Sequence, residues 1–155
     1  MSIKNIVFAF TALVISSLSA VQANEELTPS SGGQFEQSGR YQVHYMALPS
    51  TLLESKIANT YGIKRSSYNA FVNIAILDTL IEGNPAVTGK LTGHATNLTG
   101  KITQLTFKEI KEGDAIYYIA QLPYRHKEQF TIQVRSVNRD GLNSHLKFTE
   151  QFYVD

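Results

Sequence analysis

The sequence predicts an all-β protein, an antiparallel β-sandwich of about seven strands with one short helix after the first strand. From Gly39 onward the dominant hydrophobic period is two, as in strands with one buried and one solvated face. Turn signals recur at roughly ten-residue spacing, and only the stretch after Pro49 has the spacing of an amphipathic helix. Short strands joined by turns, without helices between them, favour an antiparallel sandwich.

The N-terminal residues are typical of a secretion signal. Lys4 precedes the apolar run "IVFAFTALVISSLSA", which is too short to span a membrane, and "VQA" then offers the small residues that a signal peptidase recognises. A membrane anchor is the alternative, but a polar segment follows at once and no basic stop-transfer cluster appears. We therefore expect residues 1–23 to be a signal peptide cleaved after Ala23, and the mature chain to be periplasmic without a stable membrane anchor.

Composition narrows the classes of partner and chemistry. The formal charge of the whole chain is +1, and residues 1–23 contain Lys4 and no acid, so the mature chain is formally neutral. A neutral chain is not expected to bind nucleic acid. The absence of cysteine excludes disulfides, a thiol nucleophile and an acylated cysteine. Residues 24–38 are polar and predict a flexible lead-in to a single domain over 39–155.

The strands are expected in the following order. The first is "YQVHYMAL", which ends at Pro49 because the residue before a proline favours extended backbone. In "GKLTGHAT" Lys90, Thr92, His94 and Thr96 share a solvated face. The segments around 105, 117, 132 and 148 alternate in the same way. An outer-membrane barrel is the competing architecture, and it is disfavoured because the chain ends in "FYVD" and its solvated faces carry Lys, Gln, Arg and Thr.

The helix follows Pro49. Ser50 is predicted to cap its start, and Gly62 to end it in a left-handed conformation, with Ile63 folding back onto it. Its apolar stripe consists of Leu53, Ile57, Ala58 and Tyr61. So short a helix is not stable alone in water, so we expect the stripe to pack across the sandwich.

One later segment indicates the kind of sandwich. "EGDAIYYIAQL" resembles the sixth strand of immunoglobulin variable domains, with Ile119 where those domains have a cysteine. The alternation places Tyr118 and Tyr117 on opposite faces and leaves open which of them is inside.

Several passages together resemble a bacterial exported family, domain of unknown function 4426. They are "YQVHYMALPSTLL", "YGIKRS", the "NLTGK" turn, and "LTFKEI" leading into "EGDAIYYIA". The resemblance covers the chain from about Gly39. It implies a small periplasmic protein of Gram-negative bacteria with an all-β, immunoglobulin-like build, and it supplies no catalytic or binding residues.

The sequence contains no motif for an enzyme. The four histidines lie on separate segments without metal-ligand spacing: His44, His94, His126 and His145. Neither a G-x-S-x-G motif nor a glycine-rich phosphate loop occurs. We therefore assign no catalytic residue, metal or cofactor. A hydrolase with a site assembled from distant residues stays open as an alternative, because spatial triads are invisible in a sequence.

A binding or accessory module acting through protein–protein contact is the favoured interpretation, with an unknown periplasmic protein as partner. The expected surface is the rim of the first strand and helix, formed by His44, Tyr61, Lys64, Arg65 and Tyr68. Tyrosine and arginine contribute most energy at interfaces. Tyr61 packing inward and Arg65 pairing with an acid are the alternatives. A second candidate surface is the tip "PYRHKE", with Tyr124, Arg125 and His126 exposed together.

Two further modes of binding are open. A partner strand could add to an exposed sheet edge. A small molecule could bind in a pocket under the helix, and its binding would raise the melting temperature.

Overall fold

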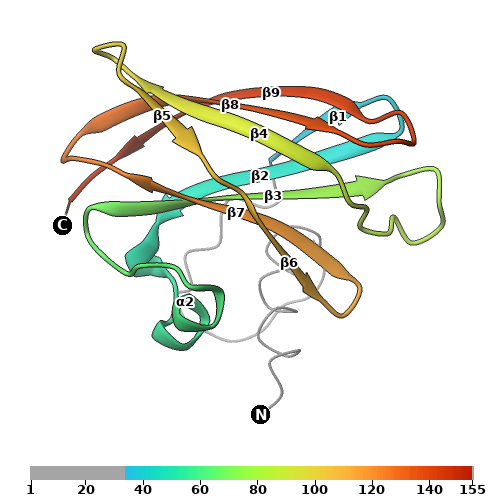
Figure 1. Ribbon diagram of the computed structural model, residues 1–155, viewed down its shortest axis with the longest axis horizontal. Helices are drawn as coiled ribbons and strands as arrows, with labels where there is room; N and C mark the ends of the chain where they lie inside the picture. Colours follow the sequence, from blue (N-terminus) through green and yellow to red (C-terminus); the bar gives the residue numbers. More distant parts are fainter. Residues whose placement is uncertain (1–33, 155) are drawn as a thin grey trace, which may run out of the picture.

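The structure, a computed structural model, describes residues 34–154. The expected signal peptide, its cleavage after Ala23 and residues 24–33 lie outside the described residues. Two antiparallel sheets pack face to face (Figure 1). The described strands are β1 Phe35–Ser38, β2 Tyr41–Pro49, β3 Asn69–Asp78, β4 Lys90–Asn97, β5 Ile102–Leu105, β6 Lys108–Glu112, β7 Ala115–Pro123, β8 Glu128–Val137 and β9 Asn143–Phe152.

The strand order confirms the predicted sandwich. One sheet has five strands in the order β1-β2-β3-β7-β6, and the other has four in the order β5-β4-β8-β9. Strand β1 lies inside the segment expected as a flexible lead-in, because its sequence "FEQS" has little hydrophobic pattern of its own. It is extended because it pairs with β2, with Phe35 opposite His44 and Ser38 opposite Tyr41.

The main core lies between the two sheets and contains Tyr118. The Tyr118 hydroxyl donates to Glu109 Oε2 at 2.7 Å and accepts the Gly89 N–H at 2.9 Å. Burial raises the pKa of Tyr118 to about 12; the Glu109 carboxylate adds to this and the Gly89 N–H opposes it. Tyr117 is buried on the opposite face of the same sheet. Both tyrosines are therefore inside, in two different clusters.

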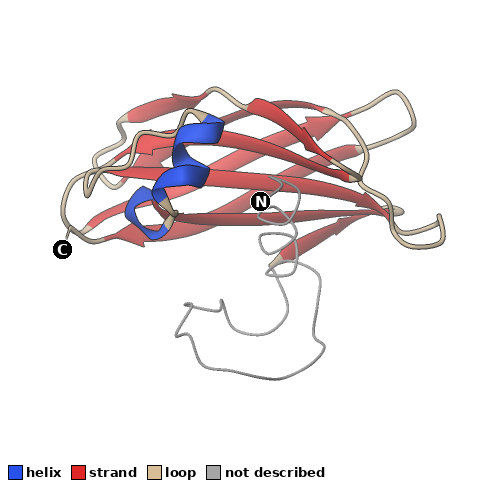
Figure 2. Cartoon of the chain, turned by 90° about the horizontal axis from the view of Figure 1, so that it is seen from below, coloured by secondary structure: helices blue, strands red, loops and turns tan. Residues whose placement is uncertain are grey.

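The second cluster lies under the helix α2, Ser55–Tyr61, which crosses the outer face of the five-stranded sheet (Figure 2). Leu53, Ala58 and Ile63 pack there against Phe71 and Tyr117. The predicted end of the helix is confirmed: Gly62 is left-handed with φ 69°, and the Ile63 N–H donates to the Ala58 carbonyl at 2.8 Å.

The predicted start of the helix is wrong. Ser50 begins a 3-10 turn, η1 Ser50–Leu52, and α2 starts later with Glu54 at its N-cap and no side-chain cap. The Ser50 hydroxyl instead donates to the Ser66 carbonyl at 3.1 Å and accepts the Ser66 N–H at 3.0 Å. The Ser50 side chain thus joins the start of the connection between β2 and β3 to its end at Ser66. Within residues 34–154 no helix is long and apolar enough to cross a membrane.

Candidate functional site

The expected rim is only partly exposed, and His44 is not on a solvated face. Its side chain is 6% exposed, because β1 lies beside β2 and the Phe35 ring lies 5.1 Å from the imidazole. His44 Nε2 is 3.2 Å from Gln42 Oε1. Burial lowers the pKa of His44, which favours the neutral imidazole. His44 is therefore buried, and it is not on the solvated face predicted for it from the sequence.

Arg65 binds the protein's own backbone. Its Nε donates to the Leu53 carbonyl at 2.7 Å, and Nη2 donates to the Thr51 carbonyl at 2.9 Å. A longer bond of 3.3 Å joins Nη1 to the Ser55 hydroxyl. These carbonyls lie in the irregular turn before α2, where helical hydrogen bonds do not satisfy them. The Arg65 guanidinium thus holds the turn and helix start in place, and its hydrogen-bond partners are two backbone carbonyls and a hydroxyl rather than an acid.

Tyr61, Lys64 and Tyr68 differ in exposure. Tyr61 is half-buried against the cluster under α2, which agrees with the alternative that its side chain packs inward. Burial raises its pKa to about 12, with the nearby Glu112 carboxylate adding to the effect. Lys64 is exposed, and its backbone N–H donates to Gln121 Oε1 at 2.8 Å. Tyr68 is 59% exposed, so it is the large aromatic side chain of the expected rim that faces solvent.

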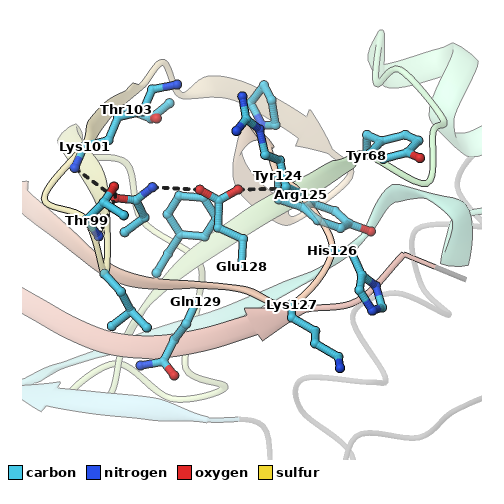
Figure 3. A pocket seen from close by; sticks show the side chains of 14 residues that line it. Tyr68, Thr99, Lys101, Thr103, Tyr124, Arg125, His126, Lys127, Glu128 and Gln129 are labelled. Carbon is cyan, nitrogen blue, oxygen red and sulfur yellow. Dashed lines mark hydrogen bonds between the residues drawn. The ribbon is translucent and has the colours of Figure 1, made fainter.

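The two predicted surfaces meet at one end of the sandwich. The Tyr124 N–H donates to the Tyr68 carbonyl at 2.9 Å, so the segment before β3 lies beside the β7–β8 turn. These segments and the β4–β5 turn surround a groove of about 620 Å³ (Figure 3). We call this region the loop end: Tyr68, residues 97–101, residues 123–130 and Tyr153.

Tyr124 is not exposed at the tip, contrary to the expectation. It is 4% exposed, stacks on Phe152 with ring centroids 4.9 Å apart, and its hydroxyl donates to the Tyr153 carbonyl at 3.3 Å. It continues the inward alternation of β7 by one residue beyond the end of the strand. Tyr124 therefore supports the loop end from below, while Arg125 and His126 are exposed as predicted.

Glu128 fixes the geometry of the loop end. Its Oε1 accepts the Asn97 side-chain amide at 2.8 Å, and its Oε2 accepts the Arg125 N–H at 2.8 Å. Asn97 Oδ1 in turn accepts the N–H groups of Thr99 at 3.1 Å and Lys101 at 2.9 Å. One carboxylate thus connects the β4–β5 and β7–β8 turns (Figure 3). Its oxygens are used internally rather than by a lysine or arginine side chain.

The groove is consequently bordered by cations without acidic partners. Lys101, Arg125 and Lys127 are exposed around it. Across residues 34–154 the ion pairs are Arg40 with Asp78 and Lys111 with Glu109, and neither pair lies at the loop end. The region therefore favours a negatively charged ligand.

Exposed apolar and aromatic side chains accompany these cations. Leu98 is 79% exposed and Tyr153 is 50% exposed. The His126 ring lies edge-on to Tyr153 with centroids 6.1 Å apart, and its Nδ1 accepts the Val154 N–H at 3.1 Å. The sequence interpretation missed Leu98 and Tyr153. The signal for Leu98 was a leucine inside the "NLTG" turn, where no buried face can accommodate it.

No group of three or more metal-ligating side chains gathers anywhere in the described range. Taken together, the loop end has the composition of a binding surface: a groove, aromatic and aliphatic anchors, and unpaired cations.

The solved structure of a similar protein agrees with this architecture. A crystal structure of a DUF4426 family protein from Pseudomonas aeruginosa PAO1 is 27% identical and has a TM-score of 0.70, covering 82% of this chain and 99% of that chain. FetP from uropathogenic Escherichia coli strain F11, expressed in the periplasm of E. coli BL21(DE3), is 12% identical with a TM-score of 0.49, covering 77% of this chain and 91% of that chain.

A copper-bound FetP variant is 13% identical with a TM-score of 0.45, covering 77% of this chain and 88% of that chain. A search of curated proteins found no match. The family model described as a domain of unknown function, DUF4426, matches residues 35–155. The chain therefore belongs to the DUF4426 family.

Proposed function

We propose that this protein is an exported, periplasmic binding module that holds an acidic segment of a protein partner at the loop end. The observation that carries the proposal is the combination of exposed Tyr68, Leu98 and Tyr153 with cations that have no carboxylate partner. Export is supported by the signal-like features of residues 1–23.

The chemistry of the groove favours a protein as partner. Tyrosine and arginine recur as energetic anchors in protein interfaces, and an arginine can bind a carboxylate through two parallel hydrogen bonds. The Arg125 guanidinium is available for such a bond, because the residue is exposed and takes part in neither ion pair of the described residues; its hydrogen bond to Glu128 is made by the backbone N–H. The turns are preorganised by Glu128 and Asn97, so little conformational entropy is lost when a partner binds.

A small anionic molecule is the second candidate ligand for the same groove. Its volume of about 620 Å³ lies within the range of small-molecule sites. A thermal shift with free dicarboxylates or amino acids distinguishes this candidate, because a bound small ligand raises the melting temperature of the isolated domain.

The test is retention of a partner by matched charge-reversal variants. Arg125→Glu places a negative charge at the loop end, and Arg139→Glu makes the same change in the β8–β9 turn at the other end of the sandwich. The purified mature protein is immobilised and exposed to an extract of the cell envelope. We expect a specific partner to be retained by the wild type and by Arg139→Glu, and to be lost from Arg125→Glu and Tyr68→Ala. Equal retention by all four proteins would place the binding surface elsewhere.

A further inference from the structure

The four-stranded sheet has an outer face that is separate from the loop end. In Figure 1 this sheet is the upper layer, and no other described helix or strand covers its outer side. The register aligns the outward side chains in rows across the strands. One row has threonines on three strands: Thr96 is opposite Thr131, which is opposite Thr149, and Ile102 of β5 continues the row beside Thr96 at the sheet edge.

The next two rows combine hydrogen-bonding and cationic side chains. Gln133 lies between His94 and Lys147 in one row. Arg135 lies between Thr92 and His145 in the other. Neighbouring strands are about 4.8 Å apart and successive rows about 7 Å apart, so the face is a regular grid of donors and acceptors.

Positive charge on this face is not neutralised by acids of its own strands. The four strands contain two acids, Glu128 and Glu150, and both are in the inward-facing alternation. Glu128 is bound by Asn97 and the Arg125 N–H. Glu150 is half-buried, and burial raises its pKa. The cations Arg135 and Lys147 are exposed and have no ion-pair partner among the described residues.

The centre of the grid is hollowed. A depression of about 460 Å³ is lined by Thr92, His94, Gln104, Gln133, Arg135 and Lys147. Gln133 is one of the lining residues, and its amide nitrogen lies 3.5 Å from His94 Nε2. The exposed polar groups that surround the hollow can therefore bind a ligand that lies flat along the sheet.

The side chains discriminate between classes of partner. A stable protein interface needs aromatic or large apolar anchors at its centre, and the three rows contain none on β4, β8 and β9; the exposed apolar side chain of Ile102 lies at the edge of the face, on β5. Single-stranded nucleic acid is held by stacking on aromatic side chains, which these rows also lack. Threonine, glutamine and histidine match the many hydroxyls of a sugar polymer, and Arg135 and Lys147 match its carboxylates.

We propose that the outer face of the four-stranded sheet binds a linear anionic polysaccharide, with Arg135 and Lys147 holding its carboxylates and Gln133 and the threonine row holding its hydroxyls. The threonine row borders the loop end, but the charged residues Arg135 and Lys147 line the hollow of the sheet and not the groove of the loop end. A variant that loses one activity is expected to retain the other.

The test is isothermal titration of the mature protein with oligomers of polygalacturonate as the probe, at low and at physiological ionic strength. We expect measurable binding that weakens with salt, and no binding of neutral dextran of the same length. Arg135→Glu and Lys147→Glu should each weaken binding about tenfold or more. Both side chains are exposed, so the variants should melt at the wild-type temperature.

Arg139→Glu is the matched control, since it makes the same charge change in the β8–β9 turn outside the grid. It should bind like the wild type. Equal weakening by Arg139→Glu would reduce the effect to overall charge and overturn the proposal. The proposal is also overturned if polygalacturonate does not bind, or if single-stranded DNA of the same length displaces it at equal or lower concentration.

Discussion

Replacing Arg65 by methionine tests whether this arginine stabilises the fold or binds a partner. Methionine keeps an unbranched apolar stem and removes the guanidinium. Two short hydrogen bonds are lost, to the Leu53 carbonyl at 2.7 Å and to the Thr51 carbonyl at 2.9 Å, together with a weaker bond of 3.3 Å to Ser55. At about 1 kcal/mol net for each short bond, the free energy of unfolding should fall by about 2 kcal/mol.

For a domain of this size that loss corresponds to a fall of about 8 °C in melting temperature. Urea unfolding followed by circular dichroism and a thermal melt measure the two quantities. Arg125→Met is the control, because the structure shows its backbone N–H, rather than its guanidinium, in a hydrogen bond to Glu128. An Arg65→Met variant that melts like the wild type but loses partner binding would refute the assignment of Arg65 to the helix connection.

The remaining predictions concern the core. Gly93→Ala should lower the free energy of unfolding, measured with urea, by about 2 kcal/mol. The reason is that a Cβ there would lie 2.8 Å from the Gln133 carbonyl oxygen and 3.1 Å from the Phe107 ring. An unchanged urea midpoint would contradict this packing. Ser144→Ala should leave stability unchanged or raise it by about 1 kcal/mol, because its buried hydroxyl has no partner within the described chain; a clear loss would reveal one. Burial lowers the pKa of His44, so as the pH falls the unfolded chain takes up a proton before the folded chain does. The contribution of His44 to stability is therefore complete above about pH 6.5, and it is lost as the pH drops through the folded pKa. His44→Leu should therefore reduce the loss of stability between neutral and acidic pH, and an unchanged pH dependence would argue against a buried neutral imidazole.

Local signals predicted the helix end correctly. Gly62 adopts the left-handed conformation, and Ile63 folds back onto Ala58, because both depend on neighbouring residues. The role of Ser50 was not predictable in this way, since its partner Ser66 lies beyond the helix. A serine after a proline carries the same sequence signal whether it caps a helix or closes the loop that contains it.

Strand alternation predicted the sandwich but not which faces remain exposed. Alternation placed His44 opposite the main core, and a two-layer sandwich normally leaves that face solvated. Here the outer face of the five-stranded sheet is itself covered, by α2 and, at His44, by the Phe35 side chain that the pairing of β1 brings beside it. The polar sequence of β1 contains no hydrophobic pattern that would reveal this pairing.

The candidate site depended on tertiary pairing. Tyr68 and Arg125 were assigned to two separate surfaces, and the pairing of Asn69 with Pro123 between β3 and β7 brings them together. In the sequence Glu128 is simply the last charge of the tip "PYRHKE", whereas in the structure its carboxylate connects the β4–β5 and β7–β8 turns. Sequence spacing gives no information on such contacts, because the register of non-neighbouring strands decides them.

Site-specific photo-crosslinking in living cells tests the central claim most directly. Leu98 and Leu80 are matched in exposure, at 79% and 74%. Leu98 belongs to the β4–β5 turn and Leu80 to the β3–β4 connection, and these two segments lie at opposite ends of the sandwich (Figure 1). Each is replaced in turn by a photoreactive phenylalanine in the full-length chain. We predict a discrete crosslinked protein from the Leu98 position, absent from the Leu80 position and abolished by Arg125→Glu. The same product from both positions, or a product from Leu80 alone, would contradict the loop end as the binding surface.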